Sequence, residues 1–165
     1  MLNPIDTDAV IRDGRVAGAI PGEIHEGVAW WVAACFVVVS QARQMAVAHD
    51  GHDTTAGFHR RFCLGAINAE YWGCQISSLG TADEAQLLHA MKELGGVPGA
   101  LLTTTEIGGR QNITILLYDA DGQPVTEGTG LGKLREMVAS DRVPIPVNDQ
   151  AKGSITERRD LVEKP

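Results

Sequence analysis

Hydrophobic residues occur along the chain in two patterns, a helical spacing and short apolar segments typical of buried strands. Helical spacing predicts helices over about 23–43, 55–72, 81–94 and 130–140. Short apolar segments predict strands near 45–49, 74–79, 99–104 and 112–118. This alternation predicts an α/β fold, a three-layer αβα sandwich with a mixed, mostly parallel sheet of about four strands.

The segment from Val28 to Val39 is uncharged and contains three consecutive valines, which lower helix propensity. Its length still favours a helix over a strand. Its twelve residues are too few to cross a bilayer of about 30 Å as a helix.

The segment from Gly99 to Gly122 contains the main candidate for a functional loop. It predicts a strand over 100–103, a polar turn over Thr104–Gln111 and a second strand over 112–118. A hydroxyl-rich loop at the end of a buried strand is where α/β folds usually place their chemistry. An ordinary connection between two strands, with threonines as strand formers, explains the same residues.

The length, net charge and cysteine content of the chain limit the kinds of protein it can be. The 165 residues predict one domain over 1–142 and an extended, charged tail over 143–165. A net charge of −7 argues against nucleic acid and against an anionic membrane surface as partners. Three cysteines without metal-binding spacing are interpreted as reduced core residues, and the lack of a signal-peptide pattern leads us to expect a cytoplasmic protein.

Four segments, in order, resemble motifs of the first domain of the α-D-phosphohexomutases, the phosphomannomutase and phosphoglucomutase family. The similar segments are Pro21-Gly-Glu-Ile-His-Glu-Gly-Val-Ala29, Met45-Ala-Val-Ala-His-Asp-Gly-His52, Gly99-Ala-Leu-Leu-Thr-Thr-Thr-Glu-Ile-Gly108 and Gln111-Asn-Ile-Thr-Ile-Leu116. The resemblance implies a domain that, in the family, carries a phosphoserine and works with three further domains. Those domains hold Mg²⁺ and the sugar, and they have no counterpart in this chain.

The positions that carry the family's chemistry are altered here. Thr105 stands at the phosphoserine position and Glu106 at the following histidine. Ile115 replaces a lysine, and His52 replaces an arginine. A carboxylate beside a phosphate-bearing hydroxyl repels like charge, and the loss of two cations weakens any phosphate site.

The sequence therefore predicts a stand-alone phosphomannomutase-like domain that has lost mutase activity and acts as a binding, regulatory or assembly module. The alternative is a small enzyme with repurposed acid–base chemistry in the same region. The candidate catalytic residues are Thr105, Glu106, His52 and Asp50. The candidate ligand-binding residues are Arg12, Asp53, Thr104 and Arg110. No metal site and no cofactor are predicted, and the ligand would be a small molecule.

Apolar residues after the last predicted strand lead us to expect an exposed patch and a homodimer, or else a complex with a protein partner. These residues are Val125, Leu131, Leu134, Val138, Val143, Ile145 and Val147. One of the tryptophans of the first long helix could serve as an anchor in this interface.

Overall fold

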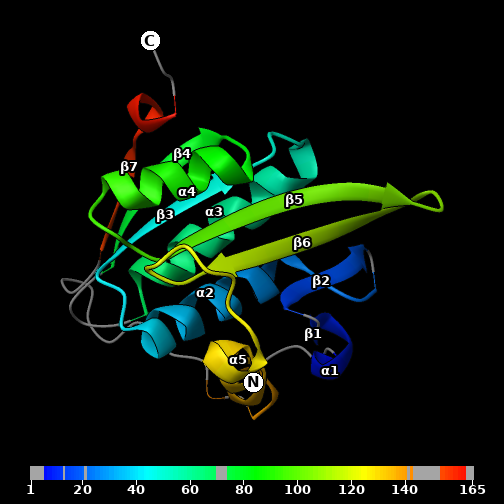
Figure 1. Ribbon diagram of the computed structural model, residues 1–165. Coiled ribbons are helices and arrows are strands. Elements are labelled where there is room, and N and C mark those ends of the chain that lie inside the picture. Colours follow the sequence, from blue (N-terminus) through cyan, green and yellow to red (C-terminus); the bar gives the residue numbers. More distant parts are fainter. Residues whose placement is uncertain are drawn as a thin grey trace.

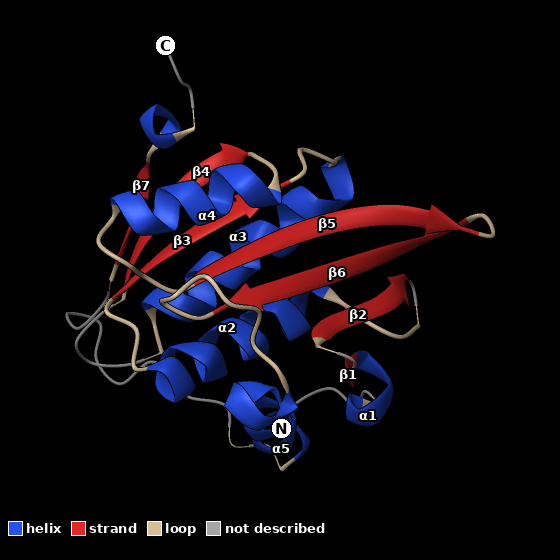
Figure 2. Cartoon of the chain, viewed as in Figure 1, coloured by secondary structure: helices blue, strands red, loops and turns tan. Residues whose placement is uncertain are grey.

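The computed structural model describes residues 6–12, 14–20, 22–69, 74–140, 142 and 153–162, with residue 12 described by its backbone alone. They form a seven-stranded mixed sheet covered by helices on both faces (Figures 1 and 2). The strand order is β1-β2-β6-β5-β3-β4-β7. The pairs among β5, β3, β4 and β7 are parallel, and the pairs among β1, β2, β6 and β5 are antiparallel. The predicted α/β class is confirmed, with more strands than the expected four.

The strands are β1 (Ile11–Arg12), β2 (Arg15–Ile20), β3 (Gln44–His49), β4 (Gln75–Thr81), β5 (Gly99–Ile107), β6 (Arg110–Tyr118) and β7 (Ser154–Glu157). The α-helices are α1 (Thr7–Val10), α2 (Glu26–Ser40), α3 (Asp53–Ile67), α4 (Glu84–Glu93) and α5 (Gly132–Ala139). A π-helical turn, η1 (Glu127–Leu131), leads into α5, and a 3-10 turn, η2 (Arg159–Leu161), follows β7. The four predicted strands correspond to β3 to β6 and the four predicted helices to α2 to α5.

The sheet divides the core into two layers. α2, α3 and α5 pack on one face of the sheet, and α4 packs on the other with η2 beside it. α2 lies between α3 and α5, which explains why it is apolar on almost every side. The segment Val37–Val39 belongs to its last turns, so the helix prediction for this segment is confirmed.

Three strands were not predicted. β1 and β2 lie in a segment expected to be irregular, and β2 is held by antiparallel pairing with β6. β7 lies within the expected tail and pairs in parallel with β4, although all four of its side chains are exposed. It therefore joins the sheet mainly through its backbone.

The expected apolar patch is not on the surface in the described part of the chain. Val125, Leu131, Leu134 and Val138 are at most 4% exposed and belong to the core around α2. The prediction that they form an exposed interface is wrong, because α5 and η1 fold this segment back onto α2. Val143, Ile145 and Val147 lie outside the described residues.

The tryptophans of α2 and the three cysteines lie in or against the core. Trp31 is buried and Trp30 is half-buried on α2, while Trp72 lies outside the described residues. The three cysteines are buried and unpaired with one another, as expected. Among the described helices, none has the length and apolar character needed to cross a membrane.

Candidate functional site

The segment predicted as an active-site loop is the distal part of a regular β-hairpin. β5 and β6 pair without interruption from Gly99 opposite Tyr118 to Ile107 opposite Arg110. Only Gly108 and Gly109 form the turn, with φ of 59° and 78°, as a tight two-residue hairpin turn requires. Figure 1 shows the hairpin extending past the rest of the sheet. The prediction of a polar loop over 104–111 is therefore wrong.

Pairing in the hairpin separates the predicted catalytic residues. Thr105 lies opposite Asn112 and Glu106 lies opposite Gln111, and both Thr105 and Glu106 are exposed. Thr104 contacts α3, so Thr105 points to the opposite face of the sheet. The structure thus places Thr104 beside the β3–α3 loop and places Thr105 away from it.

Asp50 connects that loop to the hairpin. Its Oδ1 accepts from the backbone N–H of His52 at 2.9 Å, and its Oδ2 accepts from the backbone N–H of Thr104 at 2.7 Å. Partial burial alone would raise the pKa of Asp50, but these bonds and one from the Thr55 hydroxyl lower it below its ordinary value. The Thr104 hydroxyl lies 2.5 Å from that of Thr55, which completes the network.

The start of α3 provides a second link to the hairpin. The Nδ1 atom of His52 accepts from the backbone N–H of Thr54 at 3.0 Å and caps the helix. The Thr54 hydroxyl donates to Oε1 of Gln111 on β6 at 2.7 Å. These bonds hold the distal part of the hairpin against the N-terminus of α3.

A pocket of about 550 Å³ lies beside this junction. Its walls come from the end of β2, the N-terminal turns of α2 and α3 and the start of β6. The lining residues are Ile20, Gly22, Ile24, His25, Glu26, Asp53, Thr54, Gly57, Phe58 and Gln111. The volume falls in the usual range for small-molecule sites, about 300–1,000 Å³.

The structure brings together only some of the residues predicted from sequence. Asp50, His52, Asp53 and Thr104 lie at or next to the pocket, whereas Thr105 and Glu106 do not contribute to it. Arg110 lies near its rim, because a Cβ added at Gly22 would be 3.4 Å from the Arg110 guanidinium. Arg12 is placed in β1 by its backbone, and its side chain lies outside the described residues.

The prediction missed several lining residues. His25, Glu26, Phe58 and Gln111 were not among the candidate site residues, although His25 and Glu26 lie in the first of the four family-like segments and Gln111 lies in the last. Among the residues that the structure describes, no group of His, Cys, Asp or Glu has an arrangement that could hold a metal ion.

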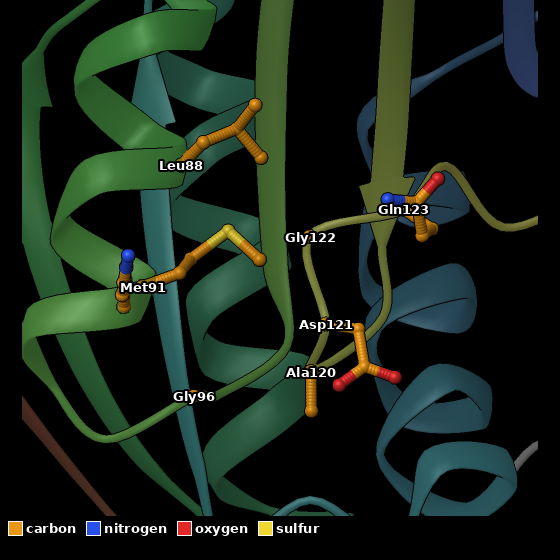
Figure 3. A pocket seen from close by; sticks show the side chains of 8 residues that line it. Leu88, Met91, Gly96, Ala120, Asp121, Gly122 and Gln123 are labelled. Carbon is orange, nitrogen blue, oxygen red and sulfur yellow. The ribbon is translucent and has the colours of Figure 1, made fainter.

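A second pocket, of about 510 Å³, lies between α4 and the turn after β6. Figure 3 shows Leu88 and Met91 on one side of it and Ala120, Asp121 and Gln123 on the other. None of the residues predicted from sequence lines this second pocket. The pocket at the hairpin junction is therefore the stronger candidate.

Comparison with known proteins gives a fold but no close relative. No family model matches the sequence. No curated protein matches it significantly either. Solved structures do match, among them a phosphoglucomutase/phosphomannomutase family protein from Burkholderia thailandensis, with a TM-score of 0.68 and 14% identity. A structure described as a proposed phosphomannomutase from Thermus thermophilus also gives a TM-score of 0.68, with 20% identity.

The two matches include 93% and 95% of this chain but only 33% of either matched chain. At these identities the likeness concerns the fold alone. The chain thus has the fold of about one third of these phosphoglucomutase/phosphomannomutase structures.

Proposed function

We propose that this chain is a phosphomannomutase-like domain without mutase activity that binds a small molecule in the pocket at the hairpin junction. The observation that carries the proposal is the position of Thr105. This residue resembles the family's phosphoserine in sequence, yet it lies within a paired strand with its side chain on the face away from the pocket.

The surroundings of Thr105 support a loss of phosphoryl transfer. Such transfer depends almost entirely on positioning and on cations or donors around the moving phosphoryl group. Glu106, at the position that resembles the family's histidine, brings a negative charge to this part of the strand where the family has a neutral or cationic side chain. Ile115, at the position that resembles the family's lysine, is fully buried in the core, and the His52 ring caps α3 through Nδ1.

Binding is better supported than repurposed acid–base catalysis. Asp50 is the best-placed candidate base, but both of its carboxylate oxygens accept hydrogen bonds from the backbone. Its lowered pKa makes it a weaker base than an ordinary aspartate. The arrangement therefore suits Asp50 to a structural role in holding the hairpin next to the pocket.

Two assays test the proposal on the purified chain. With Mg²⁺, an activating hexose bisphosphate and mannose or glucose 1-phosphate, we expect no mutase turnover. A ligand-observed NMR screen of small polar molecules should find binders that Phe58→Ala weakens. Turnover that disappears in Thr105→Ala, or a screen in which no compound binds, would contradict the proposal.

A further inference from the structure

The pocket at the hairpin junction is bordered by the N-termini of two helices, which ordinarily attract anions. Here the free amide groups are partly occupied. The Nδ1 atom of His25 accepts from the Gly27 N–H at 3.1 Å, and the Nδ1 atom of His52 accepts from the Thr54 N–H at 3.0 Å. A phosphate would have to compete with these two caps.

Each helix also places a carboxylate in its first turn at the pocket. These are Glu26 on α2 and Asp53 on α3. Each helix N-terminus carries about half a positive charge, so the two together offset only about one of the two carboxylate charges. The Arg110 guanidinium near Gly22 brings the local charge close to zero. A dianionic phosphate gains no net attraction from such a site.

The pocket offers both acceptors and donors. Because His25 accepts through Nδ1, its Nε2 carries the proton, and this buried donor has no hydrogen-bond partner among the residues that the structure describes. The two carboxylates accept hydrogen bonds and cannot donate. Because Gln111 accepts from Thr54 through Oε1, its amide nitrogen supplies a second donor. A ligand that satisfies this set must bring several donors of its own and at least one acceptor, as hydroxyl groups do.

The remaining walls are apolar. Ile24 and Phe58 are 2% and 3% exposed, and they face a cavity of about 550 Å³. An aromatic ring and a branched side chain offer contact area to the C–H face of a compact molecule. The pocket therefore combines an apolar wall with carboxylate acceptors at its rim.

We infer that this pocket selects an uncharged polyhydroxylated molecule, a sugar or cyclitol without a phosphate group. This inference rests on the proposed binding function and specifies the chemical class of its ligand. Carboxylates bind vicinal hydroxyl groups through charge-assisted hydrogen bonds, which are stronger than those between neutral groups.

The test is a ligand-observed NMR screen of neutral hexoses, pentoses and cyclitols, each measured beside its phosphate ester and its amino analogue. We expect neutral compounds to bind and their phosphate esters to bind at least about tenfold more weakly, as for the loss of one charged hydrogen bond. Asp53→Asn should weaken the neutral compound by about tenfold and narrow its preference over the phosphate. Asp121→Asn, which removes an exposed carboxylate at the second pocket, is the matched control and should change neither affinity.

The outcomes separate the two proposals. Preferential binding of phosphate esters or of amino analogues would overturn the inference and leave the binding function standing. Binding of neutral compounds that Asp53→Asn leaves unchanged would overturn it as well. If no compound binds, the proposed function fails together with the inference. Thermal unfolding of each variant checks that the fold is retained.

Discussion

The crossing of α2 and α3 sets the walls of the pocket, and one glycine permits it. A Cβ added at Gly65 would lie 2.5 Å from the carbonyl oxygen of Trp30 and 2.9 Å from its Cα. Ordinary contacts to carbon need about 3.5 Å, so Gly65→Ala forces the two helices apart by up to about 1 Å. The obstruction is backbone, which cannot rotate out of the way.

Overpacking of this kind costs about 1–3 kcal/mol, while Gly→Ala inside a helix gains up to about 1 kcal/mol from propensity. Gly57→Ala is a matched control in the same helix. A Cβ at Gly57 meets only the end of the exposed Glu26 side chain, with Cδ 2.9 Å away, and that side chain can turn aside. The propensity gain is similar in both variants, so Gly65→Ala should be less stable than Gly57→Ala by about 1–3 kcal/mol.

Urea unfolding followed by circular dichroism measures this difference. If the two variants unfold with equal free energies, or if Gly65→Ala is the more stable, the close approach of α2 and α3 at Trp30 is refuted. A loss of ligand affinity in Gly65→Ala, with the fold retained, would further connect the crossing to the pocket.

Three further predictions concern pH, the Asp50 network and the hairpin turn. Burial, and then the nearby His49 ring, lower the pKa of His59 from 6.5 to about 4, so the unfolded chain binds a proton that the folded one does not. The contribution of His59 to the free energy of unfolding should therefore be fully present above about pH 6.5, and the free energy should fall by up to about 3 kcal/mol as the pH drops to about 4. Urea unfolding of His59→Gln at the same pH values should show a smaller fall. Asp50→Asn should lose about 1–3 kcal/mol in the same assay at neutral pH, because its amide group cannot accept from both backbone donors; an unchanged midpoint would refute the network. Gly109→Val should speed the hydrogen exchange of the hairpin amides, because valine disfavours the positive φ of this position. Gly108→Asn should leave the exchange rates nearly unchanged, because asparagine tolerates positive φ. Equal effects of the two variants would argue against the two-residue turn.

Local patterns predicted the central elements well. The apolar stripes of α2 to α5 and the four central strands could be read from the sequence because each buries a continuous apolar face. Helix starts were less accurate. α4 begins at Glu84 behind a capping box of Asp83 and Gln86, whereas a helix from 81 was predicted. α3 begins at Asp53 behind the His52 cap, whereas a helix from 55 was predicted.

The unpredicted strands depend on distant partners. β2 contains small residues and is defined by pairing with β6, about 95 residues further along the chain, and β7 is defined by pairing with β4. A pattern within the segment itself carries little of this information. The same holds for the apolar residues of α5, whose burial depends on where α2 lies.

At the candidate site, the family resemblance led us to group Asp50 and His52 with Thr104, and the structure does bring Asp50 into contact with Thr104. The sequence did not predict which side chains face the pocket. Successive side chains of a strand point to opposite faces, so a shift of one residue decides whether Thr104 or Thr105 points towards α3. The pairing across the two-residue Gly-Gly turn fixes this register.

The central claim is that Thr105 cannot take part in phosphoryl transfer. It is tested most directly by mass spectrometry of the intact chain after incubation with Mg²⁺ and a hexose 1,6-bisphosphate, with peptide mapping of Thr103, Thr104 and Thr105. We predict an unchanged mass, because Thr105 lies in a paired strand with its side chain away from the pocket. A stoichiometric gain of one phosphoryl group that maps to Thr105 and is absent in Thr105→Val would contradict the account.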